Sequence, residues 1–522
     1  MKHSSARVLE FDALRELVER YASSELGRAR VAALTPSVDA GWIETQHQLT
    51  AEIREFRRGG GGFEFAGLTD IRPLLQKARI SGAMLETAEI RDVIRALEQA
   101  AEWREIALDP PEWLRSGWPR VRQLSSAIAD FTEFLRGFRG KILPDGTLDD
   151  RASPELASIR REIEKQRRQI QVSLASYLRR LSEGGRAQEE LVTLRGERFV
   201  IPVKAEHKRR VEGVVHGASS SGQTVFVEPL ETIEQNNELV RLLEDEQAEV
   251  RRILIEMTRK IEERADEISV AVDTLAELDL EFAKAKFAEE YECVAPAWVG
   301  SSGGPPPLPG ISQPGGNFAP GAGGPELILE DARHPLLERN LKAKNQRVVP
   351  VTIELDGRGR ELIITGPNTG GKTVALKTLG LLVLMAQAGI PVSANRMKIP
   401  VFDAVLADIG DYQSIEQNLS TFSAHLTNID FISRTATPNS LVLLDELGSA
   451  TDPEEGAALA VAIAEYFLGR GAFTLISTHH ASLKVFGADS PGVVNAAVGF
   501  DEATLKPTYE LKLGVPGRSA GI

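Results

Sequence analysis

The sequence predicts a multidomain protein with a mainly α-helical N-terminal part, a small β-rich segment within that part, and an α/β domain near its C-terminal end. Apolar side chains recur at helical spacing through most of the N-terminal part, and strands and helices alternate after a segment rich in glycine and proline. A length of 522 residues suggests roughly three domains. Hydrophobic residues make up 42% and charged residues 26% of the chain, which are globular values and exclude wholesale disorder.

Helical periodicity divides the N-terminal part into a core domain and a pair of long helices. Residues 1–145 are expected to form a helical core domain. Residues 146–190 and 231–295 carry apolar side chains spaced by three, four or seven positions, which predicts two long helices packed as an antiparallel coiled coil. We call this pair the lever. Its second stripe predicts helix from about residue 231 toward residue 290.

A β-rich segment at residues 191–230, which we call the clamp, separates the two lever helices. It is rich in β-branched residues and punctuated by Pro202, Gly213, Gly217 and Gly222, so a few short strands are expected. Four cations fall within seven positions and no aromatic residue lies among them, a composition that suits contact with a phosphate backbone rather than base stacking or sequence readout. These cations are Lys204, Lys208, Arg209 and Arg210. The basic residues of the first lever helix fit a solvated helix face as well as a binding surface.

Charge and cysteine content restrict the class of protein. The formal net charge of −14 argues against coating of nucleic acid by bulk electrostatics, although screening leaves room for local basic patches. The single cysteine, Cys293, excludes a disulfide framework within the chain and a cysteine-based zinc site. The sequence has no continuous apolar segment of signal-peptide or membrane-spanning type, so a soluble, cytoplasmic protein without membrane contact is expected.

A glycine- and proline-rich linker at residues 296–326 precedes an α/β domain at residues 327–522. In this domain an apolar strand leads into a glycine-rich loop and then a helix, the arrangement in which backbone N–H groups and a helix N-terminus bind phosphates. The loop predicts a site for ATP and Mg²⁺, in which Lys372 reaches the β and γ phosphates and Thr373 binds Mg²⁺. The predicted nucleotide-binding residues are Gly366, Pro367, Asn368, Thr369, Gly370, Gly371, Lys372 and Thr373.

An acidic pair follows a second apolar strand about seventy residues later. Leu441 to Leu444 place Asp445 and Glu446 at the carboxyl end of a buried strand. Asp445 is expected to hold Mg²⁺ through its water shell, and Glu446 to polarise the attacking water.

Three further features narrow the class. Ser420 opens a helical stretch, a turn at residues 448–453 follows the acidic pair, and the strand 473–476 leads to His479. Each alone fits a helix cap, a turn or a surface histidine. In this order they resemble the signature helix, D-loop and switch histidine of ABC-type ATPases, which implies that the signature helix of one subunit completes the ATP site of another.

The motifs GPNTGGKT, DELGSATDP and STHH, together with RHPLL at residues 333–337, resemble the ATPase of the MutS superfamily. IEQNLSTFSAHL, the clamp segment and the opening LEFDALRELVERYASSELGRARVAALTP are similar to its type-2 branch in particular, so the resemblance covers nearly the whole chain. It implies a homodimer whose levers and clamps close around branched DNA, collided ribosomes or both, driven by ATP. It also implies that Asn368 helps to place the γ-phosphate, Ser420 reaches the partner's ATP and His479 senses the γ-phosphate.

Two other functions remain open at this point. The energy-coupling subunit of a membrane transporter shares the phosphate loop, acidic pair and switch histidine, but a long helical arm with a basic β tip favours the nucleic-acid clamp. The second is a non-hydrolysing scaffold, and the presence of Lys372, Asp445 and Glu446 argues against it. Type-2 proteins typically continue into a small nuclease domain. The sequence carries no recognisable nuclease motif of that kind, so nuclease activity is not expected from these 522 residues.

Overall fold

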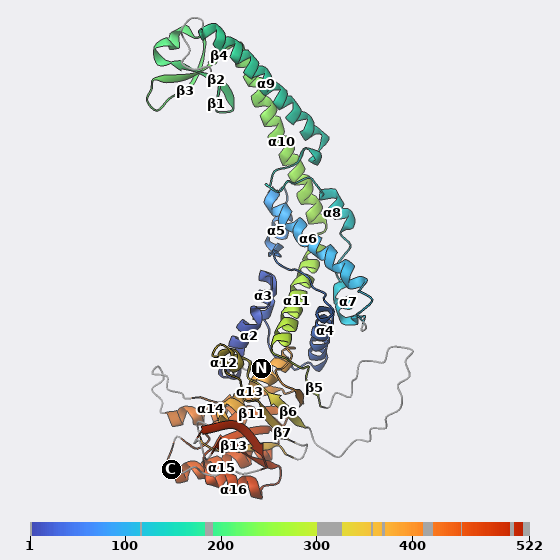
Figure 1. Ribbon diagram of the computed structural model, residues 1–522, viewed down its shortest axis with the longest axis vertical. Helices are drawn as coiled ribbons and strands as arrows, with labels where there is room; N and C mark the ends of the chain where they lie inside the picture. The colour runs from blue at the N-terminus through green and yellow to red at the C-terminus, as the bar shows by residue number, and fades with distance from the viewer. Residues whose placement is uncertain are drawn as a thin grey trace. The chain divides into compact units, whose positions relative to one another are not determined.

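A computed structural model describes residues 3–114, 117–182, 192–299, 326–355, 359–367, 371–410, 421–449, 451–501 and 506–514 (Figure 1). It divides into two compact units. Unit 1 comprises residues 1–68, 103–127 and 273–522, and unit 2 comprises residues 69–102 and 128–272. The prediction of a multidomain chain with helical and mixed α/β parts is confirmed. Each unit draws on separate segments of the chain, and the predicted core domain, residues 1–145, is shared between them.

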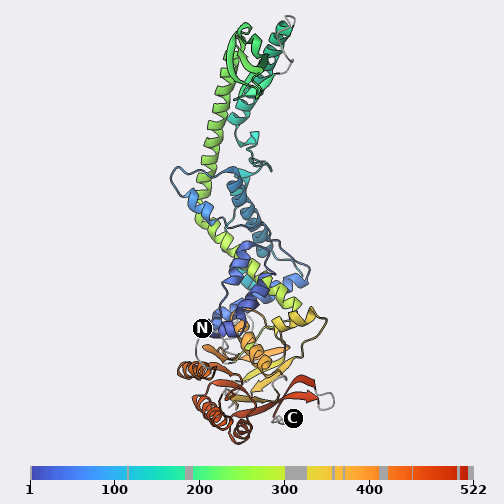
Figure 2. The ribbon, with the colours of Figure 1, turned by 90° about the vertical axis from the view of Figure 1, so that its left-hand side faces the viewer.

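Unit 2 contains two long helices that lie side by side, with a small sheet beside their ends (Figures 1 and 2). These helices are α9 (Pro154–Ser182) and α10 (Ile233–Glu263). The sheet has the strand order β1-β2-β4-β3 and is antiparallel throughout. Its strands are β1 (Thr193–Arg195), β2 (Arg198–Lys204), β3 (Gly213–Ala218) and β4 (Thr224–Pro229). Shorter helices of this unit are α5 (Arg72–Ala78) and α8 (Thr132–Phe138).

One hydrophobic cluster joins the two long helices to the sheet of unit 2. Ile170 and Leu174 of α9 pack with Leu239 of α10 and with inward-facing strand residues such as Ile201 and Val227. Most of β2 is buried, at Phe199 to Ile201 and at Val203, whereas every residue of the edge strand β3 is exposed. Packing of the sheet on the helices therefore uses β2 and β4.

The second lever segment is not one continuous helix. α10 ends at Glu263, Arg264 leaves helical geometry with φ −116° and ψ 15°, and α11 (Ala265–Glu290) follows. The apolar stripe continues across the break, because Ile261 and Ile268 are both fully buried, and this continuity is why periodicity alone predicted uninterrupted helix. Arg264 donates to the backbone oxygen of Asp130 and lies 4.6 Å from the Phe131 ring centroid. These contacts hold the side chain at the break.

Unit 1 is built on two sheets. The larger has the order β10-β11-β12-β8-β13-β14, parallel except for the β13–β14 pair, and the smaller has the order β5-β9-β6-β7. The large sheet consists of β8 (Glu361–Thr365), β10 (Ala404–Asp408), β11 (Ser440–Leu444), β12 (Phe473–Thr478), β13 (Val493–Asp501) and β14 (Lys506–Leu513). The small sheet consists of β5 (Ala297–Trp298), β6 (Leu327–Ala332), β7 (Val351–Leu355) and β9 (Arg396–Ile399).

Helices cover both faces of the large sheet. These helices are α13 (Lys372–Gln387), α14 (Thr421–Thr435), α15 (Pro453–Arg470) and α16 (Ala481–Asp489), while α12 (Pro335–Lys342) adds Leu336 to the core of the same unit. Neighbouring strand residues alternate between the faces: Leu441 and Leu443 join a cluster with α13, whereas Val442 and Leu444 join a second cluster with residues of α14 and α15. Both faces are thus buried, as expected of a parallel sheet.

The α13 face is also covered by the start of the chain. Helices α1 (His3–Val8), α2 (Phe11–Glu19) and α3 (Glu25–Ala32) contribute to the same hydrophobic cluster as α13, with Leu9 and Leu14 fully buried. The end of α11 joins this cluster through Phe287 and Tyr291 next to it. Helices α4 (Ala40–Arg58) and α7 (Pro119–Ser125) also belong to unit 1, and α6 (Thr87–Leu108) contributes residues to both units. Unit 1 therefore has one main core built from three distant segments.

Candidate nucleotide site

The turn between β8 and α13 brings glycines to the carboxyl edge of the large sheet. Gly366 has φ 137°, and a Cβ atom added there would lie 2.6 Å from a Val498 methyl carbon. Gly371 has φ 94° at the N-cap of α13. These conformations are sterically costly for other residues, so glycine is needed at both ends of the turn. Pro367 follows Gly366 in the described part, whereas Asn368, Thr369 and Gly370 lie outside the described residues.

Lys372 begins α13 and folds back over this turn. Its Nζ donates to the backbone oxygen of Gly366 at 2.6 Å, and the whole residue is 1% exposed. Burial lowers the pKa of Lys372, while the carboxylates of Glu446 and Asp445 act in the opposite direction. An anion bound at this edge would add to the effect of the carboxylates and favour the charged ammonium. The residues therefore fit a phosphate group.

Thr373 and Asp445 meet where β8 and β11 end. Thr373 Oγ1 donates to Asp445 Oδ2 at 2.8 Å, and the other carboxylate oxygen of Asp445 accepts from the hydroxyl of Ser477. The backbone N–H of Asp445 donates to the backbone oxygen of Asp408 at 2.9 Å. Hydroxyl and carboxylate oxygens are ligands that Mg²⁺ prefers, so Thr373 and Asp445 are suited to hold this ion.

Glu446 and two histidines complete the polar edge. Glu446 has φ 50°, an uncommon conformation for a residue other than glycine. His479 follows β12, and its pKa is lowered by burial first and then by the nearby His480 and Lys372. The rings of His479 and His480 are 4.3 Å apart, and a Cβ atom added to Gly448 would lie 3.0 Å from His480 Nε2. The predicted acidic pair, the turn after it and the switch histidine thus converge at one place.

A pocket of about 610 Å³ opens beside Gly371. Arg347, Val349, Val374 and Tyr509 are among the residues that line it. This volume lies within the usual range for small-molecule sites, and an aliphatic and aromatic lining suits a flat heterocycle. Sequence reasoning did not find these residues. The local signal was the aromatic residue Tyr509 in β14, and its placement near Gly371 depends on the pairing of β14 with β13.

The remaining predicted site residues lie elsewhere. Ser420 lies outside the described residues, and α14 begins directly after it. Lys204 ends β2, and Lys208 and Arg209 lie in the short 3-10 helix 205–210 of unit 2, where all three are exposed. The Arg210 side chain lies outside the described residues. Within the described residues, none of the other three cations makes an ion pair of the kind that holds Arg198 to Glu228 at 2.8 Å.

An α/β domain with a lysine, a threonine and an acidic pair at the carboxyl ends of its parallel strands is expected of a MutS-type ATPase region. Residues 362–522 match the family described as MutS domain V. The chain is 41% identical over 517 residues to "Endonuclease MutS2" of Thermomicrobium roseum and 39% identical over 520 residues to that of Geobacillus thermodenitrificans. Each match covers 99% of this chain and 62% of the relative. The chain belongs to the MutS2 branch of the MutS family.

These relatives do not support the alternative of a transporter subunit. Among the helices that the structure describes, none is both long and apolar enough to cross a membrane.

Proposed function

We propose that this chain binds and hydrolyses ATP with Mg²⁺ and uses the cycle to open and close a homodimeric clamp on nucleic acid. The observation that carries the proposal is the 2.8 Å contact between Thr373 Oγ1 and Asp445 Oδ2, made next to the buried ammonium of Lys372. A magnesium–triphosphate complex requires oxygen ligands for Mg²⁺, which Thr373 and Asp445 supply, and a positive charge for the phosphates, which Lys372 supplies. Membership of the MutS family supports ATP as the nucleotide.

In this proposal each residue at the sheet edge has one task. Backbone N–H groups of the turn 366–371 surround the phosphates, with Asn368 placing the γ-phosphate, and Lys372 neutralises the β and γ phosphates. Thr373 and Asp445 would hold Mg²⁺, which would neutralise charge on the phosphates. Glu446 orients and polarises the attacking water.

The pocket lined by Val349 and Tyr509 would hold the adenine base, because it opens beside Gly371 at the start of α13. His479 would contact the γ-phosphate from the end of β12. Its lowered pKa favours the neutral imidazole, which can donate one hydrogen bond and accept another. Ser420 would reach the ATP of the partner subunit, so that turnover requires a dimer.

The clamp supplies the second half of the proposal. Lys204, Lys208 and Arg209 are exposed at the end of β2 and in the following 3-10 helix, where they can approach phosphates without first breaking an ion pair within the described residues. Together with Arg210 they would bind the backbone of branched DNA or of ribosomal RNA in collided ribosomes. Contact through phosphates alone does not distinguish these two substrates.

Thermal unfolding with Mg-ATP tests the nucleotide half. A ligand at a hundred times its dissociation constant stabilises a folded protein by about 2.7 kcal/mol, so the wild type should show a clear upward shift. Lys372→Ala should show none. Lys377→Ala is the matched control, because Lys377 lies on the same helix but is bonded to Glu10 at 3.1 Å. Equal shifts in the wild type and Lys372→Ala would refute the site.

A further inference from the structure

A buried carboxylate at the end of β10 holds the first turns of α14. Asp408 is 2% exposed, and its Oδ2 lies 2.8 Å from His425 Nδ1. Asn428 Nδ2 donates to Asp408 Oδ1 at 2.8 Å and to the backbone oxygen of Ala407 at 3.2 Å. His425 and Asn428 are three residues apart and therefore share one face of the helix. Both oxygens of the Asp408 carboxylate are thus bonded to α14.

The same aspartate is bonded to the strand that carries the catalytic pair. The backbone oxygen of Asp408 accepts the N–H of Asp445, and β10 and β11 run parallel up to the pairing of Asp408 with Leu444. A cavity of about 20 Å³ is lined by Asp408 and His425 and also by Asp445 and Glu446. That space is about enough for one water molecule. The polar cluster and the catalytic carboxylates are therefore immediate neighbours.

We propose that Asp408, His425 and Asn428 are positioning residues that couple α14 to the placement of Glu446. The inference rests on the proposed function, in which the segment leading into α14 contacts the ATP of the partner subunit. A buried carboxylate that loses its donors is costly, so α14 cannot move away from β10 without a large penalty. The helix α14, the end of β10 and the backbone amide of Asp445 consequently move together. Binding of the partner's nucleotide next to α14 then changes the geometry at Glu446.

Such coupling acts on turnover and not on binding of nucleotide to the chain's own phosphate turn. None of the three residues belongs to the β8–α13 turn or to the pocket beside Gly371. Small displacements of a catalytic group reduce rates strongly, by up to about a hundredfold for 1 Å. A variant that loosens the cluster should therefore lower kcat much more than it weakens nucleotide affinity.

Two substitutions of His425 in the full chain test this role. His425→Leu removes the nitrogen that faces Asp408, whereas His425→Asn keeps an amide nitrogen close to the position of Nδ1. Asp430→Asn is the matched control, because it breaks an ion pair with Arg434 on the same helix whose two side chains are largely exposed. The measurements are kcat and KM for ATP, the dissociation constant for Mg-ADP and the thermal midpoint.

We expect His425→Leu to lower kcat about tenfold or more, with the dissociation constant for Mg-ADP changed less than about threefold. His425→Asn should recover most of kcat, and Asp430→Asn should match the wild type. Unchanged kcat in His425→Leu would overturn the inference, as would His425→Asn failing to recover activity while its thermal midpoint equals that of the wild type. A wild type that neither binds nor hydrolyses ATP would instead refute the proposed function.

Discussion

Glu446 donates its backbone N–H to the hydroxyl oxygen of Ser477 at 2.9 Å, which connects the ends of β11 and β12. Ser477 in turn donates to the carboxylate of Asp445. Glu446 keeps its left-handed conformation within this arrangement, at a cost of about 1 kcal/mol or more. Strained backbone conformations of this kind cluster at functional sites, where they fix the orientation of a side chain.

Glu446→Gln should retain Mg-ATP binding and lose turnover by about a hundredfold or more, because the oxygens of Thr373 and Asp445 remain while no carboxylate polarises the water. Steady-state phosphate release measures this loss. Glu454→Gln, at an exposed position in the first turn of α15, is the control. Turnover within a few-fold of the wild type would exclude Glu446 as the base.

ATP should also drive Glu446→Gln toward the dimer, because ATP held without turnover would prolong the proposed state in which Ser420 reaches the partner's ATP. Sedimentation velocity with and without Mg-ATP measures the change. A sample that remains monomeric at saturating ATP would contradict the role of Ser420 in the partner's site.

Reversal of the clamp cations to glutamate should weaken nucleic-acid binding equally for all sequences and flatten its dependence on salt. Each duplex phosphate contact that is lost removes about 0.9 from the slope of log affinity against log salt. The variant changes Lys204, Lys208, Arg209 and Arg210 together. Titrations of branched DNA at several salt concentrations, and co-sedimentation with ribosomes, provide the measurement.

The control for the clamp variant reverses Arg434 and Lys512, which are exposed cations of unit 1. It should leave the salt slope unchanged. Equal slopes for the wild type and the clamp variant, together with equal ribosome co-sedimentation, would show that the four cations only keep the clamp surface solvated.

Glu361 should make stability depend on pH. It starts β8 fully buried, neither of its carboxyl oxygens has a hydrogen-bond partner among the described residues, and burial raises its pKa to about 8. The folded state therefore binds this proton more tightly than the unfolded state, in which the pKa is about 4.5. Its contribution to stability is complete below about pH 4.5 and is lost as the pH rises through 8.

Glu361→Gln removes this titration. The variant should exceed the wild type in stability at pH 8 by on the order of 4 kcal/mol, since one unit of pKa difference corresponds to about 1.4 kcal/mol. The difference should nearly vanish at pH 5. Thermal midpoints at the two pH values measure it, and a difference independent of pH would show that the carboxyl group does not titrate between them.

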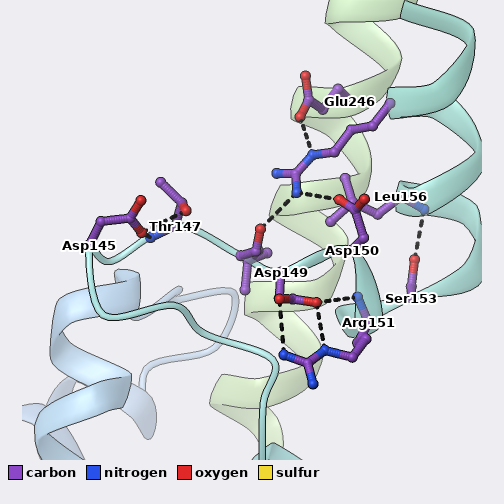
Figure 3. Close-up of polar contacts among 10 residues, drawn as sticks. Asp145, Thr147, Asp149, Asp150, Arg151, Ser153, Leu156 and Glu246 are labelled. Carbon is purple, nitrogen blue, oxygen red and sulfur yellow. Dashed lines mark hydrogen bonds and ion pairs between the residues drawn. The ribbon is translucent and has the colours of Figure 1, made fainter. Parts of the chain in front are cut away.

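Arg160 and Arg161 of α9 should contribute very differently to stability, although they are adjacent and both are arginines. Arg160 donates to Glu246 at 2.7 Å and to Asp150 and the Leu148 backbone oxygen at 2.8 Å each (Figure 3). Arg160→Gln should therefore lower the free energy of unfolding by about 1–3 kcal/mol. Arg161 is exposed, so Arg161→Gln should change the free energy of unfolding by less than about 0.5 kcal/mol. Urea unfolding measures both, and equal effects would refute the distinction.

Local sequence pattern predicted the strands that carry the candidate nucleotide site. The apolar run 441–444 forms β11 with Asp445 after it, and the run 473–476 lies in β12. Local pattern could not place Asp408 beside Asp445, because the order of parallel strands depends on contacts between distant segments. The same limit concealed the position of Tyr509 beside Gly371. The break at Arg264 was missed because the apolar stripe continues through it.

The shared core of unit 1 limits how this chain can be divided. Leu9 and Leu14 lie in one hydrophobic cluster with Leu376 and Leu379 of α13, and Phe287 from the end of α11 belongs to it too. A fragment starting at residue 327 would keep every proposed ATP ligand but expose the apolar surface that those distant residues cover. A chimera made from two relatives should therefore fold only when its N-terminal helices and its α/β region come from the same parent. The part of the chain that must be kept together is therefore discontinuous in the sequence.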